Sequence, residues 1–300
     1  MSSTAIPTID SELEVPPEKP SAVARLFQWV RKQPLGAAGG LIVLLMIFAG
    51  AFAPWLTSYD PTANDFSAMH QAPGAEHWLG TDQFGRDLLS RIMYGARTAL
   101  IVGFVSAFVG ATLGLVLGVA SAYFGGRFDL IFQRVMDVFM AFPLIIMALA
   151  VVSIFGAGLQ NVIIAITIPF IPRCARVVRS SALAIREVPY IDAARAMGFS
   201  DARIILRHMV PNVMAPYLIL ITAFVGQAIL LEASLSYLGL GVQEPTPAWG
   251  LMLQGGAEEY AESAPWIAVF PGLAITLGVF GFNLFGDAVR DTLDPKLRTQ

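Results

Sequence analysis

One acidic residue directly follows a long charge-free stretch: Glu232, in the segment LLEASLSYLGLG. An acid at membrane depth usually faces a water-filled cavity or a partner group, because an isolated charge in hydrocarbon is costly. We therefore predict that Glu232, with Gln227, faces a passage near its outer end and favours cationic groups. The alternative is a structural carboxylate that binds backbone groups where the helix breaks at Gly239 and Gly241.

The residue types of common active sites are present without catalytic spacing. No lysine follows a glycine-rich loop, no HExxH pairs the histidines, and no GxSxG elbow occurs. The single cysteine, Cys174, excludes an intrachain disulfide, and no Cys/His cluster has metal-ligand spacing. We expect no catalysis, metal or cofactor in this chain, and its scattered arginines predict no nucleic-acid module.

The composition is typical of a membrane protein. Of the 300 residues, 56% are hydrophobic and only 14% are charged, and the mean hydropathy is +0.65. A soluble domain usually carries about 25% charged residues. The elements that position Glu232 should therefore be helices that contact lipid.

Five stretches lack Asp, Glu, Lys and Arg: 33–59, 98–126, 138–172, 208–231 and 263–286. A helix needs about 20 apolar residues to cross the hydrocarbon core. The third stretch is too long for one ordinary span, and the GAG at 156–158 predicts a turn within it. Splitting it into 134–155 and 159–175 predicts an all-α polytopic membrane protein with six transmembrane helices.

The positions of the basic residues support this split. With the N-terminus inside, all but three of the 19 Lys and Arg fall in inner segments, the exceptions being Arg86, Arg91 and Arg97. This bias is what the positive-inside rule requires. A five-span arrangement would export the arginines of 173–213 or reverse the N-terminus. We therefore expect both ends in the cytoplasm.

The predicted organisation follows from these segments. It comprises an N-terminal cytoplasmic tail at 1–35, a first transmembrane helix with an outer loop at 36–97, a transmembrane core at 98–288 and a cytoplasmic tail at 289–300. The core contains an inner loop at 176–213. The long outer segments, 57–97 and 240–262, could cover a pathway or meet an external partner.

The second span carries small residues at every fourth position: Ser106, Gly110, Gly114 and Gly118. This spacing lines one helix face and lets another backbone approach closely. The approaching helix could belong to the same chain or to a second subunit.

The inner loop has the local signals of a helical hairpin. Pro189 can begin a helix, and Gly198 suits the left-handed cap at its end. Ser200 can cap a second helix, which Pro211 would end. Ala193 and Ala194 give the first helix a small surface that could enter a groove on another protein. A purely connecting loop is the alternative.

This pattern resembles the EAA loop of ABC importer permeases: Asp192-Ala193-Ala194, three residues, Gly198 and then Pro211. Three further segments are similar to the C-type subunit of the peptide/nickel permease branch: LGTDQFGRDLLSRIMYGART at 79–98, EASLSYLGLGVQEPTPAWG at 232–250 and DTLDPKLR at 291–298. The resemblance covers nearly everything after residue 35. It departs from the family at Asp192, where Glu is usual, and at Val210, where Leu commonly precedes the proline.

The resemblance implies a type I ABC importer permease fold in a bacterial inner membrane. The hairpin would be a coupling helix docked on a cytoplasmic ATPase, through Asp192, Ala193, Ala194, Gly198, Ser200 and Pro211. Two ATPase subunits would bind ATP and magnesium, and a second homologous permease, a different gene product, would complete the pathway. A periplasmic or lipid-anchored binding protein would deliver substrate.

Dipeptide or oligopeptide import is the function this resemblance favours. Nickel or opine import within the same family stays open. From another class, an autonomous secondary transporter would explain the spans and Glu232, but not a coupling hairpin.

Overall fold

The computed structural model describes residues 21–293. The predicted tails at 1–35 and 289–300 and the segment DTLDPKLR therefore lie partly outside the described residues. All regular segments within 21–293 are helical, and an isolated bridge joins Thr81 to Asp87. The helices, in chain order, are α1 (Ala22–Lys32), α2 (Pro34–Leu56), η1 (Phe66–Ala68), α3 (Leu88–Phe124), α4 (Gly126–Met140), α5 (Leu144–Phe155), α6 (Leu159–Arg186), α7 (Pro189–Ala196), α8 (Asp201–Ile204), the π-helical η2 (Ile205–Met209), η3 (Val210–Val213), α9 (Met214–Tyr237), α10 (Trp249–Glu259) and α11 (Trp266–Leu293).

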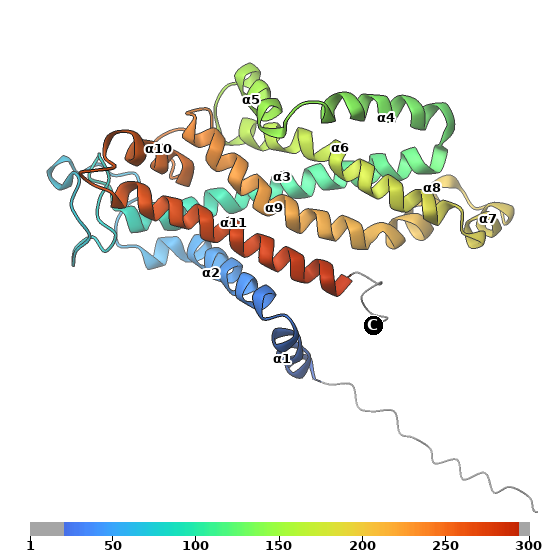
Figure 1. Cartoon of the computed structure of the whole chain (residues 1–300), viewed down its shortest axis with the longest axis horizontal. Coiled ribbons are helices and arrows are strands. Elements are labelled where there is room, and N and C mark those ends of the chain that lie inside the picture. The colour runs from blue at the N-terminus through green and yellow to red at the C-terminus, as the bar shows by residue number, and fades with distance from the viewer. Residues whose placement is uncertain (1–20, 294–300) are drawn as a thin grey trace, which may run out of the picture.

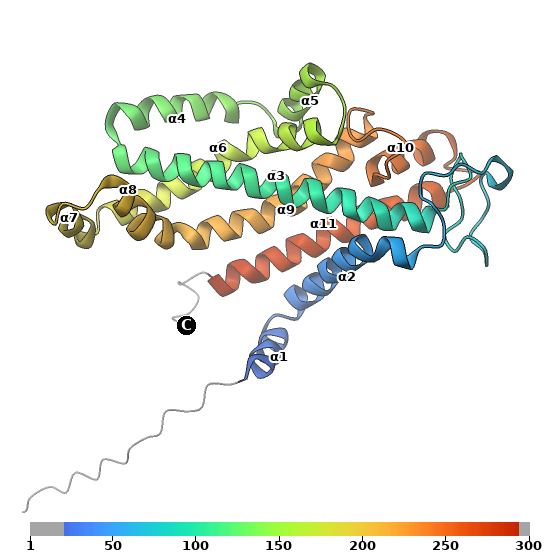
Figure 2. The same ribbon diagram turned by 180° about the vertical axis from the view of Figure 1, so that it is seen from behind.

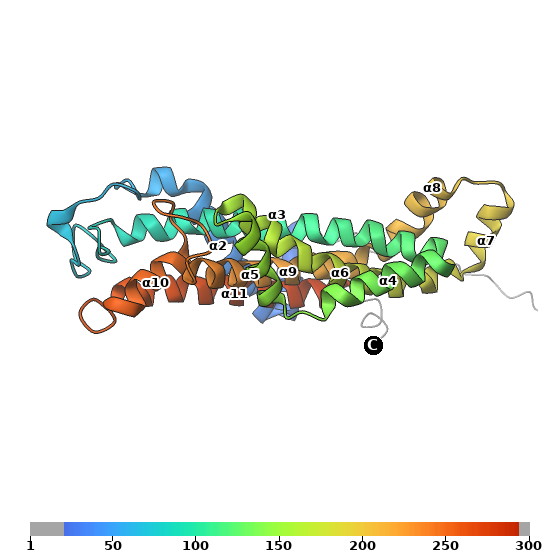
Figure 3. The same cartoon turned by 90° about the horizontal axis from the view of Figure 1, so that it is seen from above.

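The long helices run side by side and separate two ends of the molecule (Figures 1 and 2). The central α3 packs against α6 and α9, while α2 packs on α11 and α3. Helices α7 and α8 project at one end, which we call the hairpin end (Figure 3). The segment 57–87 and α10 lie at the other, which we call the loop end (Figure 1).

Five described helical segments are long and apolar enough to span a membrane, and the pair α4 and α5 gives six if it counts as one span. The predicted single helix at 134–155 is wrong, because α4 and α5 are bent by 88° at their junction. Pro143 stands at this break; it lacks a backbone N–H and disfavours a helical conformation at the preceding residue. The predicted turn at 156–158 is present, with Gly156 at φ +86° and Gly158 at φ +135°.

Several predicted boundaries fall inside helices. Helix α3 begins at Leu88, so a boundary at residue 97 cuts it, and α6 continues past the predicted 175 to Arg186. The predicted spans were limited to stretches free of charged residues. This limit placed the start of α3 too late, because Arg91 lies within the helix, fully buried with partners and not exposed to lipid. The side chain of Asp87 begins α3 by accepting a hydrogen bond from the Ser90 backbone N–H.

The small-residue stripe of α3 faces α6 of the same chain. A Cβ at Gly114 would lie 2.5 Å from the Cβ of Cys174, and one at Gly118 would lie 2.5 Å from the Ala175 carbonyl oxygen. Gly110 meets Phe170 in the same way, and the Ser106 hydroxyl donates to the Ile163 carbonyl at 3.3 Å. Intrachain packing thus accounts for the spacing, since any larger side chain would separate the two helices.

Candidate functional site: a projecting hairpin and a buried charge cluster

The hairpin is built from α7 and α8 around a left-handed glycine. Pro189 occupies the first turn of α7, and Ile191 and Ala194 are buried against the rest of the chain. Gly198 has φ +75°, and nothing lies within 4 Å of where its Cβ would be. The glycine is therefore required by the backbone conformation and not by crowding.

Two details of the hairpin differ from the prediction. Ser200 stands at the N-cap of α8, but its side chain makes no capping hydrogen bond. The carboxylate of Asp201 accepts a hydrogen bond from the Tyr123 hydroxyl at 2.6 Å instead, which ties the hairpin to the end of α3. Pro211 does not end the helix, because the π turn η2 and the 3₁₀ turn η3 carry the chain into α9.

The surface of the hairpin is more apolar than the two alanines predict. Ala194 is only 1% exposed and is unavailable to a partner, whereas Ala193 is exposed. Met197 and Leu206 are each 66% exposed, although both are large and apolar. They are the two most exposed large apolar side chains between residues 187 and 213.

Contacts within the hairpin hold its shape. The guanidinium of Arg203 lies 4.1 Å from the centre of the Phe199 ring. The Tyr190 hydroxyl donates to the His208 carbonyl at 3.3 Å and accepts from the Asn212 side chain at 3.1 Å. The Tyr190 contacts link α7 to η2 and η3, the segment that leads into α9.

Glu232 is held by its own chain near the far end of α9. Its side chain is buried, and its carboxylate accepts a hydrogen bond from the Ser236 hydroxyl at 2.7 Å. The same hydroxyl accepts from the Val242 backbone N–H at 3.2 Å, beyond the end of the helix. Gln227 makes a different contact, accepting from Arg173 of α6 at 3.2 Å. Glu232 thus reaches the backbone beyond the helix through the Ser236 hydroxyl, and its carboxylate is held within its own chain.

At the loop end, the structure assembles a charge cluster that we define as Asp82, Arg86, Arg91 and Glu244. Arg86 donates to Asp82 at 2.7 Å and to both carboxylate oxygens of Glu244, at 2.6 and 3.1 Å. Arg91 has 0% of its side chain exposed and donates to the Pro61 carbonyl at 2.9 Å. The cluster thus joins segment 57–87, the start of α3 and the loop before α10.

The cluster favours the charged form of Arg86. Burial alone would lower the pKa of this guanidinium, but the hydrogen bonds and charges of Glu244 and Asp82 raise it above its ordinary value. The Asp82 carboxylate also accepts hydrogen bonds from the backbone N–H groups of Phe84 and Arg86, each at 2.9 Å. Every member of the cluster is therefore engaged within the chain.

The family described as "Binding-protein-dependent transport system inner membrane component" matches residues 110–299. The chain belongs to this family. Residues 25–73 of the permease also match the N-terminal TM domain of oligopeptide transport permease C. The family resemblance and the all-α importer-permease fold predicted from the sequence are confirmed, and the permease is a membrane-embedded protein with several spans.

Relatives of the permease match over most of their length. A putative peptide transport system permease protein of Brucella suis biovar 1 is 44% identical over 262 residues, covering 87% of this chain and 88% of the relative. The dipeptide transport system permease protein DppC of Alkalihalophilus pseudofirmus is 42% identical over 273 residues, covering 91% and 90%. The glutathione transport system permease protein GsiD of Escherichia coli is 42% identical over 269 residues, covering 89% and 88%.

A solved structure shares the fold. A chain of the MetNI methionine ABC transporter, in an inward-facing conformation, aligns with a TM-score of 0.55 and 21% identity, covering 68% of the permease and 96% of that chain. At this identity the match concerns the arrangement of the helices alone.

The sequence analysis missed the charge cluster, although a signal was present. Arg86 and Arg91 were two of the three exceptions to the charge bias, and each lies in a segment that resembles the family. An arginine that departs from the positive-inside rule and is buried needs an acidic group to compensate its charge. In the permease that partner is Glu244, from the second long loop segment.

Proposed function

We propose that the permease is the membrane-spanning subunit of an ATP-driven importer that moves short peptides after an external binding protein delivers them. The names of the relatives support peptides as the substrate class, since they are a peptide, a dipeptide and a glutathione permease. The chain itself would not hydrolyse ATP. Two ATPase subunits would bind ATP and magnesium, and a second homologous permease would complete the passage.

The observation that carries this proposal is the projecting hairpin and its connection to the opposite end. The hairpin exposes Met197 and Leu206, which a partner would cover. From Asp201 the helical segment continues to Tyr237 without a break, and Glu232 and Ser236 then fix the turn that follows. A displacement of the hairpin by the ATPase would therefore be transmitted to the loop end along the continuous helical segment 201–237.

The distribution of basic residues supports the orientation. Arg195, Arg203 and Arg207 lie at the hairpin end, and the positive-inside rule places such residues in the cytoplasm. Both chain ends would then be cytoplasmic, in the inner membrane of a bacterium. The loop end would face the binding protein.

Reconstitution tests the proposal. The permease, its co-encoded permease and ATPases and a loaded binding protein are placed in proteoliposomes, and uptake of a radiolabelled dipeptide is measured. We expect uptake that requires ATP and magnesium and that stops when the ATPases are omitted. Uptake by the permease pair without ATPase subunits would contradict the proposal.

A further inference from the structure

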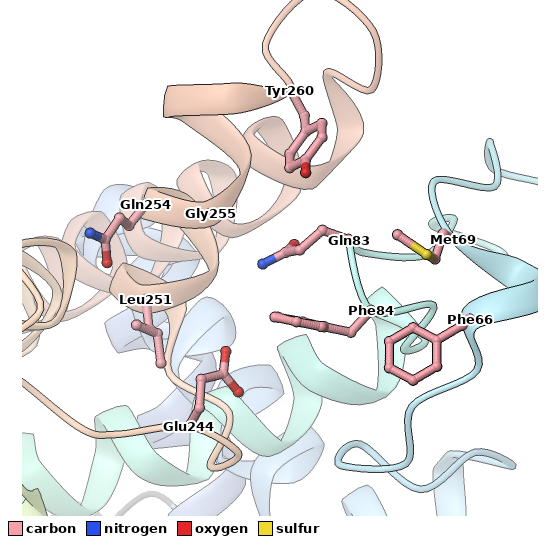
Figure 4. Close-up of a pocket in the computed structure, with 9 residues that line it drawn as sticks. All are labelled: Phe66, Met69, Gln83, Phe84, Glu244, Leu251, Gln254, Gly255 and Tyr260. Carbon is pink, nitrogen blue, oxygen red and sulfur yellow. The ribbon is translucent and has the colours of Figure 1, made fainter.

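A cavity of about 560 Å³ opens at the loop end of the permease. It lies between segment 57–87 and α10, and it is lined by Phe66, Met69, Gln83, Phe84, Glu244, Leu251, Gln254, Gly255 and Tyr260 (Figure 4). Its volume falls within the range of small-molecule sites, which are mostly apolar with a few polar groups. Phe66 is 67% exposed and Met69 is 42% exposed, so the apolar wall is accessible from outside.

A braced turn presents one wall of this cavity. The Asp82 carboxylate and carbonyl hold the turn through the backbone N–H groups of Phe84 and Gly85. Gly85 has φ +71°, and a side chain there would collide with the Asp65 backbone. The positions of Gln83 and Phe84 are therefore fixed before any ligand arrives, which lowers the entropic cost of binding.

Two polar side chains, Gln83 and Glu244, are exposed to the cavity. The Gln83 amide points towards the centre of the cavity in Figure 4 and makes no hydrogen bond with the described part of the chain. Glu244 points inwards from below, and its side chain stays 40% exposed although Arg86 binds it. Arg86 donates to its two oxygens at 2.6 and 3.1 Å, and Arg91 approaches the same oxygens from the buried side at 3.5 Å, so the exposed edge of the carboxylate faces the cavity.

The charges favour an amine over a carboxylate. The lining residues include no lysine or arginine, and the Arg86 side chain beneath Glu244 is only 4% exposed. A ligand carboxylate would meet Glu244 without an accessible cation. A ligand ammonium would meet the exposed edge of that same carboxylate and could donate a charge-assisted hydrogen bond to it.

We propose that this cavity binds the amino-terminal end of a short peptide whose side chains are apolar. Its α-ammonium contacts Glu244, its first amide pairs with the Gln83 side chain, and its side chains pack against Phe84, Leu251 and Met69. This assignment rests on the proposed function, because it names where an imported peptide would be held at the loop end.

Direct binding to the permease-containing complex tests the assignment. The complex is placed in nanodiscs without a binding protein, so that recognition by the binding protein cannot contribute. Four probes are compared: trileucine, its C-terminal amide, N-acetyl-trileucine and triglycine. We expect the C-terminal amide to match trileucine, and both N-acetyl-trileucine and triglycine to bind at least ~10-fold more weakly. Equal affinity for trileucine and N-acetyl-trileucine would overturn the assignment.

Variants locate the site. Gln83→Ala should weaken trileucine about 5-fold to 10-fold through loss of the amide contact, and Leu251→Trp should abolish binding by filling the cavity. Gln160→Ala is the matched control, because Gln160 is an exposed residue on α6 with no hydrogen bond in the described chain, and it should bind as the wild type does. Thermal unfolding confirms that each variant is folded.

A loop of the binding protein is the competing occupant. If Gln83→Ala and Leu251→Trp weaken association of the binding protein but leave the trileucine Kd unchanged, the cavity is a protein-docking site and the assignment is wrong. The proposed function fails separately, by the loss of ATP-dependence in proteoliposomes. ATP-driven uptake with no trileucine binding to the cavity would remove only the present inference.

Discussion

The two ends of the permease treat charged and apolar residues in opposite ways. At the loop end, Asp82, Arg86 and Arg91 have at most 4% of their side chains exposed, and each binds another member of the cluster. At the hairpin end the charged residues are exposed, and Met197 and Leu206 are each 66% exposed. The loop end pairs its buried charges with one another, although Arg91 Nε has no hydrogen-bond partner among the described residues, and the hairpin end leaves Met197 and Leu206 uncovered.

The difference indicates that contacts within the chain hold the loop end in shape, whereas the hairpin end has apolar surface that a partner could cover. Buried charges are tolerated only when partners compensate them, so the loop end should resist local change. Ile191, Ile204 and Met209 anchor the hairpin in the core, and Asp201 ties it to α3 through Tyr123, while its charged side chains stay exposed. We therefore expect substitutions at the loop end to affect stability most, and substitutions in the hairpin to affect transport most.

The largest expected effect is on stability, from Arg91→Ala. Removing this guanidinium leaves Glu244 with fewer partners and the Pro61 carbonyl without its donor, and breaking a buried charge pair costs roughly 3–5 kcal/mol. Thermal unfolding in detergent measures the change. Arg97→Ala is the control, since Arg97 is exposed on the same helix and its loss should change stability by less than about 0.5 kcal/mol. Equal shifts for the two variants would contradict the cluster's structural role.

A smaller loss of stability is expected from Gly114→Ala. The added Cβ would lie 2.5 Å from the Cβ of Cys174 and 2.8 Å from the Ile171 carbonyl oxygen, so α3 and α6 must separate at a cost of about 1–3 kcal/mol. Gly272→Ala in α11 is the matched substitution, because its nearest atom would be 3.8 Å away, on Leu253. Comparing the two melting temperatures checks the prediction, and a Gly272 variant that is as unstable as the Gly114 variant would refute it.

The hairpin prediction concerns coupling. Gly198→Val places a β-branched residue at φ +75°, which strains the turn by roughly 1–3 kcal/mol without a collision. Because the turn is exposed, we expect normal insertion and near-normal melting, but ATP-driven uptake reduced by about 10-fold, equivalent to ~1.4 kcal/mol. Uptake at the wild-type rate would show that the turn geometry is not used.

The smallest effects on transport are expected around Glu232. Ser236→Ala removes the hydroxyl that bridges Glu232 to the Val242 N–H, at a cost of about 1–3 kcal/mol. Ser234→Ala is the control, because Ser234 is only partly buried and its hydroxyl bonds within its own helix. Glu232→Gln should keep the uptake rate and specificity of the wild type. A changed substrate preference in Glu232→Gln would restore the idea that this acid faces the passage.

Local rules predicted those parts of the fold that depend on one residue's own backbone. Pro189 and Gly198 marked the start and end of α7 because proline fixes φ and glycine accepts a positive φ. The turn at Gly156 and Gly158 was predictable for the same reason. Charge bias then indicated the number of spans.

The remaining features depend on distant partners. Arg91 could lie inside α3 only because Glu244 compensates it from 153 positions along the chain, which spacing alone does not reveal. The sequence predicted that Ala194 would lie on the surface that contacts a partner, but the rest of the chain buries it. Pro211 is tolerated because η2 and η3 change the winding around it, and that accommodation is a property of the folded hairpin.

The central claim is that an ATPase subunit binds the hairpin on the cytoplasmic side of the membrane. The most direct test places a cysteine at the exposed tip by Met197→Cys, in a chain whose native Cys174 is buried. We predict that a membrane-impermeant maleimide labels this cysteine only in inside-out vesicles, and that a cross-linker joins it to the ATPase with a yield that changes when nucleotide is added. Labelling from the outer side, or the absence of any ATPase adduct in an actively transporting complex, would contradict the account.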